Sequence, residues 1–114
     1  MAGAAVKIVL TVPASHADAV RHAMGDAGAG RLGPYGHCSF SARGTGRYVP
    51  LPGADPYDGE VGKLSEVEEE RIEVTCERSC LRQVLAAIRR VHPYEQPAVD
   101  VYPLEDAPLP PRPS

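Results

Sequence analysis

Residues 66–76 read Glu-Val-Glu-Glu-Glu-Arg-Ile-Glu-Val-Thr-Cys, and the structure of this stretch decides the fold. The apolar residues at its end alternate with polar ones, which is the period of a strand. The acidic run before them could equally begin a helix. We predict a strand, because the β-branched residues cluster at the end and a solvated strand tolerates charges. Val67 and Ile72 have opposite parity, so a bulge or bend near Glu69 is a further expectation.

Five further elements are predicted around this strand from apolar periodicity and turn signals. The first helix begins with the capping-box-like pair Ser15 and Asp18, and the second helix ends before Pro93. Residues 43–62 are rich in glycine and proline, which predicts a long loop with a short strand at 47–49 as an option. The five elements are a strand at 6–12, a helix at 15–28, a strand at 35–42, a helix at 79–91 and a strand at 98–102.

The order strand, helix, strand, strand, helix, strand predicts an α+β fold, the ferredoxin-like βαββαβ sandwich. In this fold a four-stranded antiparallel sheet carries both helices on one face. The other face of the sheet is uncovered. Such a face is suited to packing against another subunit, so we expect a homo-oligomer. We predict one domain over residues 1–104, followed by a flexible Pro-rich tail at 105–114.

Composition narrows the class of protein. The 114 residues are 43% apolar and 24% charged, as in an ordinary globular domain. A formal net charge of −3 argues against a nucleic-acid partner, and no apolar run is long enough to suggest a membrane span. Three cysteines cannot all pair within one chain, which favours reduced thiols and a cytoplasmic location.

The segment His-Pro-Tyr-Glu-Gln-Pro at 92–97 places two prolines, a histidine, a tyrosine and a carboxylate in the connection between a predicted helix and a predicted strand. Its imidazole and carboxylate could bind a metal or another ligand, or the segment could simply stop the helix. His37 and Cys38 are neighbours on a predicted strand and would face opposite sides of it. His37 would reach the segment only if the fold brings the two together. The candidate ligand-binding residues are Tyr35, His37, His92 and Glu95, and the candidate metal ligands are His37, His92 and Glu95.

Short motifs follow one another along the chain in an order that is specific as a set, although no single motif is. They are Gly28-Ala29-Gly30, Gly33-Pro34-Tyr35, Cys38-Ser39-Phe40-Ser41, Gly44-Thr45-Gly46, Gly53-Ala54-Asp55-Pro56, Gly59, Glu70-Arg71-Ile72-Glu73 and His92-Pro93-Tyr94-Glu95-Gln96-Pro97-Ala98. On these residues the chain resembles, from about Lys7 to Leu104, the domain inserted in bacterial Nif-three-like proteins of the YqfO type. That domain also occurs as a stand-alone small protein, and we expect the same here.

The resemblance implies a ferredoxin-like fold related to CutA and the PII signalling proteins, which form trimers. It places residues 43–62 where PII proteins carry a mobile ligand-responsive loop, although no PII nucleotide-binding residue can be matched. Full-length Nif-three-like proteins build a dinuclear metal centre from segments that flank the insert. Those segments are not among these 114 residues, so we expect no such centre.

Together these observations predict a non-enzymatic ligand- or ion-binding regulatory module that acts as a homo-oligomer, with a trimer favoured. Its ligand would be a small molecule bound near a subunit junction, and no residue is assigned a catalytic role. The alternative is a metal-binding protein or metal-dependent hydrolase that holds a divalent ion with His37, His92 and Glu95. The sequence leaves the identity of the ligand or cofactor open.

Overall fold

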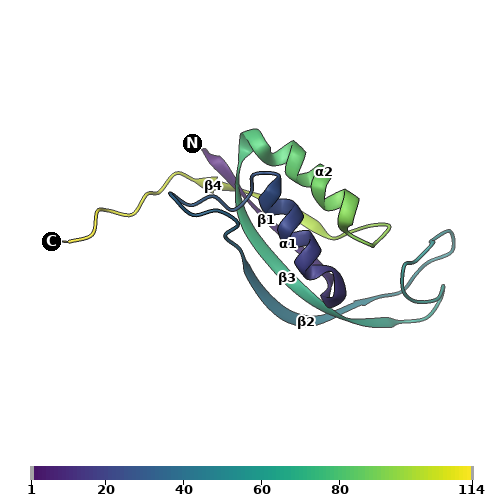
Figure 1. The fold of residues 1–114 in the computed structure, drawn as a ribbon. Helices are drawn as coiled ribbons and strands as arrows, with labels where there is room; N and C mark the ends of the chain where they lie inside the picture. Colours follow the sequence, from purple (N-terminus) through teal and green to yellow (C-terminus); the bar gives the residue numbers. More distant parts are fainter. Residues whose placement is uncertain (1, 114) are drawn as a thin grey trace.

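The structure, a computed structural model, describes residues 2–113 and consists of one sheet covered by two helices (Figure 1). The strands are β1 (Ala2–Pro13), β2 (Phe40–Tyr48), β3 (Ser65–Glu77) and β4 (Val99–Glu105), and the helices are α1 (Ala17–Asp26) and α2 (Leu81–Val91). Short 3-10 turns, η1 (Ala14–His16) and η2 (Arg78–Cys80), precede the two helices. The strand order is β2-β3-β1-β4, and every neighbouring pair is antiparallel.

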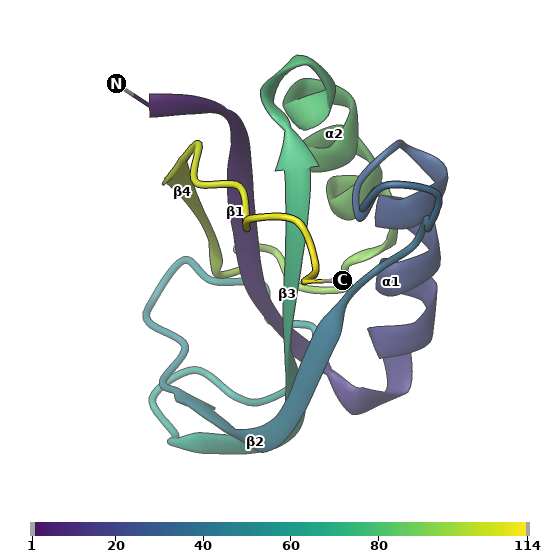
Figure 2. The same ribbon diagram turned by 90° about the vertical axis from the view of Figure 1, so that its left-hand side faces the viewer.

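Both helices lie on the same face of the sheet, as Figure 2 shows edge-on, and the predicted ferredoxin-like βαββαβ sandwich is confirmed. The alternating residues of β1 create this arrangement, because successive side chains point to opposite faces of a strand. The core residues on the helix-covered face include Val6, Ile8, Leu10 and Val12 of β1, Ile72 and Val74 of β3, Val20 and Met24 of α1, and Val84 and Ile88 of α2. Burying each such side chain contributes about 1.5–3 kcal/mol.

The decisive stretch is a strand, and the helix alternative for residues 66–76 is wrong. Its pairing with β1 runs without interruption from Ala5 opposite Glu77 to Pro13 opposite Glu69. The pairing with β2 is equally continuous, so the expected bulge near Glu69 is not present in β3. The opposite parity of Val67 and Ile72 has a simpler explanation: the strand is regular, Ile72 faces the helices and Val67 faces the opposite side of the sheet.

The second strand begins five residues later than predicted and extends further. Residues 35–39 belong to a loop, so the argument that His37 and Cys38 alternate on a strand is wrong. Gly30 anchors this loop: its N–H donates to Thr75 O at 2.7 Å, and its carbonyl accepts from Cys38 N at 2.9 Å. β2 runs through the two glycines at 44 and 46 to Tyr48, which shortens the predicted loop to residues 49–64.

The sheet face opposite the helices carries no helix, and we call it the open face (Figure 2). Lys7 of β1 pairs with Thr75 of β3 and with Tyr102 of β4, so these three side chains lie on the open face. Phe40 pairs with Glu73 and lies on the same face. Beyond β4, residues 106–113 form neither helix nor strand and extend away from the sheet (Figure 1). Within the described residues, neither α1 nor α2 combines the length and apolarity that a membrane crossing requires.

Candidate ligand-binding site

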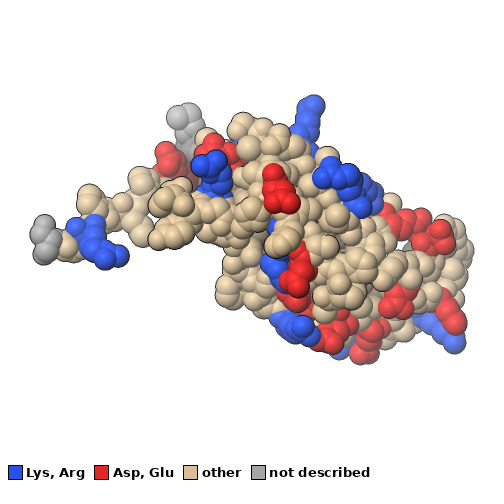
Figure 3. Space-filling view, viewed as in Figure 1, with Lys and Arg blue, Asp and Glu red and all other residues tan. Residues whose placement is uncertain are grey.

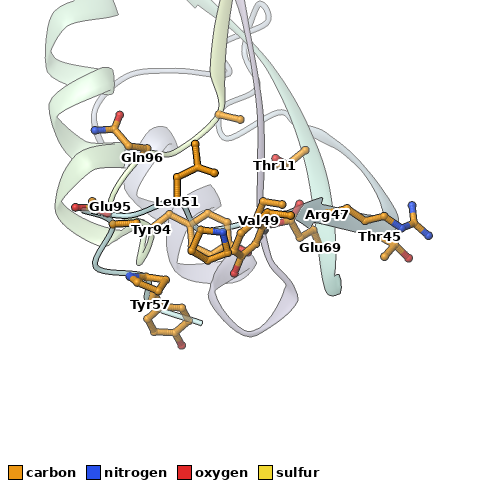
Figure 4. Close-up of a pocket in the computed structure, with 16 residues that line it drawn as sticks. Thr11, Thr45, Arg47, Val49, Leu51, Tyr57, Glu69, Tyr94, Glu95 and Gln96 are labelled. Atoms are coloured by element: carbon orange, nitrogen blue, oxygen red, sulfur yellow. Dashed lines mark hydrogen bonds between the residues drawn. The ribbon is translucent and has the colours of Figure 1, made fainter. Parts of the chain in front are cut away.

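A pocket of about 610 Å³ lies at one end of the sheet, between the loop at 49–64 and the connection from α2 to β4 (Figure 4). This volume lies within the range of small-molecule sites, roughly 300–1,000 Å³. Its walls come from strand ends (Thr11, Tyr48, Glu69), from the loop (Leu51, Tyr57) and from the connection (Tyr94). Thr11 and Glu69 project from the open face, so the pocket borders that face.

His92 does not line the pocket itself but contacts two residues that do, Thr11 and Tyr94. Its backbone leaves the helical conformation (φ −72°, ψ 128°), as expected for a residue before proline, and its side chain is 6% exposed. The ring Nε2–H donates to Thr11 O at 2.8 Å, and Nδ1 accepts from the backbone N–H of Tyr94 at 3.2 Å. Burial lowers the pKa of His92, although the bond to the Thr11 carbonyl opposes this shift. The imidazole is therefore neutral, and both of its nitrogens are engaged in positioning Tyr94.

Tyr94 and Glu69 form the polar centre of the pocket. The Tyr94 hydroxyl donates to Oε2 of Glu69 at 2.7 Å, and the glutamate is only 7% exposed. Burial is the main cause that raises the pKa of Tyr94, and the bond to Glu69 adds to it, so the phenol keeps its proton. The carboxylate lies against Gly46, where any side chain would collide with it. The absence of a side chain at Gly46 therefore makes room for the Glu69 carboxylate.

Two further tyrosine rings lie next to the ring of Tyr94. The ring of Tyr48 lies 5.8 Å from that of Tyr94, and the ring of Tyr57 lies 6.3 Å from it. The hydroxyl of Tyr48 also donates to the Asp58 carbonyl at 2.6 Å, which ties β2 to the loop. Aromatic side chains combine a large apolar surface with polar groups, so this lining suits a ligand with an apolar body.

Glu95 ties the loop to the other side of the pocket. Its carboxylate accepts the backbone N–H of Asp55 at 3.0 Å, while its carbonyl accepts from Arg89 at 3.1 Å. The loop at 49–64 is thus fastened at Asp55 and at Asp58, on two walls of the pocket. The pocket is built from four stretches of the chain that are distant in sequence: Thr11, residues 45–57, Glu69 and residues 94–98.

The structure brings two of the four predicted site residues to this pocket. Glu95 lines it and His92 lies behind it. Tyr35 lies in a turn closed by its backbone bonds with Leu32, and His37 contacts Asp26 at the end of α1 at 3.1 Å. The three predicted metal ligands are therefore not assembled. Within the part of the chain that the structure describes, no group of three His, Cys, Asp or Glu side chains could hold a metal ion.

Sequence reasoning missed Tyr48, Tyr57 and Glu69 as site residues, and it singled out the segment that contains Tyr94 without choosing that residue. A signal for Glu69 was present, since Val67 and Glu69 have the parity opposite to the apolar residues Ile72 and Val74. In a regular strand this parity places Glu69 on the open face, next to Thr11 and far from the helices. The signal for the two tyrosines was weak, because nothing local shows that the loop folds back over the sheet.

Comparison with solved structures defines the class of fold. The chain is similar to the periplasmic divalent cation tolerance protein CutA from Archaeoglobus fulgidus, with a TM-score of 0.63 and 15% identity over 90% of this chain and 86% of that one. It is also similar to the Bacillus subtilis GlnK in a GlnK–ATP complex, with a TM-score of 0.61, 14% identity, and coverage of 91% and 84%. At these identities the likeness shows the fold alone, which is CutA- and PII-like.

Sequence comparison then identifies the relatives. A Bacillus cereus protein related to NIF3 has 47% identity and a TM-score of 0.79, over 93% of this chain and 27% of that one. The GTP cyclohydrolase 1 type 2 homologs of Bacillus subtilis and Mycobacterium tuberculosis are each 45% identical over 90% of this chain and 27% of their own length. No family profile matches the chain. The chain is thus a homologue of the NIF3-related proteins and spans about a quarter of the length of these relatives.

Proposed function

We propose that the chain is a non-enzymatic binding module that takes a small molecule into the pocket formed by the sheet end, the loop at 49–64 and the α2–β4 connection. The observation that carries this proposal is the hydrogen bond from the half-buried Tyr94 to the buried Glu69 inside a pocket of about 610 Å³ with largely apolar walls. Such sites combine an apolar lining with a few fixed polar groups. The engagement of both His92 nitrogens and the protonated state of Tyr94 favour binding over acid–base chemistry.

The ligand-binding form is, in this proposal, a homo-oligomer, and specifically a trimer assembled through the open face. Two aromatic side chains on that face remain accessible, with Phe40 67% and Tyr102 50% exposed. Exposed aromatic residues on an uncovered sheet face are typical of an interface. Because Thr11 and Glu69 border the same face, assembly through it would place the pocket near a subunit junction.

The assembly predicts a measurable mass. Light scattering on the purified chain should give about three times the 12.1 kDa of one subunit. Phe40→Asp should lower the mass to that of a monomer without unfolding the chain, because a buried interfacial charge is costly whereas Phe40 is exposed in the single subunit. Leu109→Asp, at an exposed position beyond β4, should leave the mass unchanged. A monomeric parent protein would contradict the proposal.

The ligand site is tested by a fragment screen followed by NMR mapping. Fragments that bind should shift the backbone signals of Tyr48, Tyr94 and Ala98 rather than those of Lys7 and Phe40 at the other end of the open face. Ala54→Trp should fill the pocket and weaken binding at least tenfold. The control is Ala86→Trp, on the exposed side of α2, which should not change binding. Fragments that bind Ala54→Trp as well as the parent would overturn the proposal.

Two further expectations stay part of this proposal. All three thiols are free within the described structure, and Cys76 is buried, which supports a reducing compartment such as the cytoplasm. The segment after β4 contains Pro108, Pro110 and Pro111 and is exposed throughout its described length, which supports its assignment as a flexible tail.

A further inference from the structure

Among the side chains that the structure describes, Glu69 is a buried carboxylate without a cationic partner. Its neighbours in the chain, Glu68 and Glu70, each pair with an arginine, but none of the ion pairs among the described side chains includes Glu69. The single hydrogen bond recorded on its carboxylate is the one from Tyr94 to Oε2. A carboxylate can accept about four hydrogen bonds, so the Glu69 carboxylate, which lines the pocket next to Gly46, retains acceptor capacity at Oε1.

Burial of such a charge is costly unless a cation compensates it. The one arginine of the lining, Arg47, pairs with Glu66 at 3.6 Å, and Figure 4 shows its guanidinium directed away from Tyr94. The walls of the pocket therefore leave the charge of Glu69 uncompensated. A ligand that brings its own positive charge would remove this cost.

The aromatic walls add a second preference for the same kind of ligand. The faces of tyrosine rings carry partial negative charge and attract cations within about 6 Å, by roughly 0.5–2 kcal/mol. The ring centres of Tyr48 and Tyr57 lie 5.8 and 6.3 Å from that of Tyr94, the residue whose hydroxyl contacts the carboxylate of Glu69. A cationic nitrogen bound to the Glu69 carboxylate would lie close to Tyr94, and the apolar body of the ligand could reach the neighbouring rings.

The surface charge at the end of the molecule that holds the pocket also has the sign that suits a cationic ligand. Acidic side chains gather over the end of the molecule that holds the loop and the β2–β3 hairpin, at the right of Figure 3. They include Asp55, Asp58, Glu60, Glu66 and Glu68, of which the last three pair with Lys63, Arg47 and Arg43, while Asp55 and Asp58 form no ion pair among the described side chains. A field of this sign attracts cations toward the pocket and repels anions.

Building on the proposed function of this pocket, we propose that its ligand is an organic cation, an ammonium or guanidinium group on a flat apolar body. The cationic N–H groups donate to Oε1 of Glu69, while the body packs against the tyrosine rings. Tyr94 holds the carboxylate in place through Oε2. An anionic ligand would meet a like charge at Glu69, so the same residue excludes it.

The charge preference is tested with three probes of similar size: benzylamine, benzyl alcohol and benzoate. Titration followed by NMR at neutral pH and low salt should show that benzylamine binds at least tenfold more tightly than benzyl alcohol, with benzoate weakest. A tenfold ratio corresponds to about 1.4 kcal/mol. Equal or tighter binding of benzyl alcohol or benzoate would overturn the assignment of an organic cation.

Glu69→Gln keeps the volume of the side chain and an oxygen that accepts from Tyr94. This variant should reduce the affinity for benzylamine to that for benzyl alcohol, without changing the latter. Glu68→Gln removes the same charge from the adjacent residue, which pairs with Arg43 on the other side of the sheet, and should preserve the preference. An equal loss in Glu68→Gln would assign the effect to the acidic surface and contradict the role of Glu69.

The two proposals fail in distinguishable ways. If the probes bind in the pocket regardless of charge, the pocket is a ligand site and only the cation preference is wrong. If the probes and fragments bind elsewhere, or not at all, the proposed function itself fails. Glu69→Gln also has a readout without ligand: its melting temperature should match or exceed that of the parent, because an uncompensated buried charge has been removed.

Discussion

His92→Ala should destabilise the folded chain by about 2–6 kcal/mol, because it leaves the Thr11 carbonyl and the Tyr94 N–H without their partners and each such loss costs about 1–3 kcal/mol. The imidazole is 6% exposed, so its removal also leaves a void behind the pocket. Urea unfolding followed by circular dichroism measures the change directly. Tyr94 should lose its fixed orientation at the same time, which would weaken its bond to Glu69.

His22→Ala is the matched control, because His22 is exposed on α1 and should change stability by no more than about 0.5 kcal/mol. If His92→Ala were as mild as this control, the structural role assigned to the imidazole would be wrong. A ligand-contacting role, which the sequence also allowed, would then be the better explanation.

The same side chain predicts a pH dependence. Burial lowers the pKa of His92 below its ordinary value of 6.5, with His16 and Arg89 adding to the shift and Thr11 and Glu69 opposing it. The unfolded chain therefore binds the proton more tightly than the folded chain. Stability should be fully present above pH 6.5 and decline as the pH falls from there toward the folded pKa. The parent should lose more stability than His92→Gln between pH 7 and 5, and identical profiles would contradict this.

The fold was predictable where a local pattern carries the information. The alternation in β1 and in the second half of β3 indicated two strands with one buried face, and the apolar stripe of α2 indicated the helix that covers them. The start of β2 was not predictable in this way. Residues 35–39 alternate like a strand, but the bond between Cys38 and Gly30 and the left-handed backbone of His37 (φ 55°) hold them in a loop. These are tertiary constraints, which no short window of sequence contains.

Part of the candidate site was predictable from a local pattern, and the rest depended on tertiary structure. The composition of the proline-flanked segment at 92–97 suggested a candidate site, with a helix stop as the alternative, and three of its residues line the pocket. Which of its residues faces the pocket depended on the fold: Tyr94 and Glu95 line it, while His92 lies behind them. The partner of Tyr94 is Glu69, 25 residues away, and the two meet because the antiparallel register brings Glu69 to the end of the open face.

Gly30→Ala should destabilise the chain by about 2–5 kcal/mol, with about 1–2 from the left-handed backbone and about 1–3 from overpacking. Gly30 has a φ of +83°, and a methyl group there would lie 2.6 Å from Cys38 O and 2.7 Å from Cys38 N. These are backbone atoms, so they cannot rotate away as the end of a side chain could. Chemical unfolding gives the free energy, and NMR should show that Cys38 and its loop have moved.

Gly33→Ala separates the two contributions. Gly33 also has a positive φ, of +56°, but a methyl group at this position meets no atom within 4 Å. It should therefore cost only the backbone term of about 1–2 kcal/mol. The difference between the two variants measures how tightly Gly30 holds the loop against β3. If Gly30→Ala cost no more than Gly33→Ala, the loop would be free to shift, and the anchoring of residues 31–39 through Gly30 would be wrong.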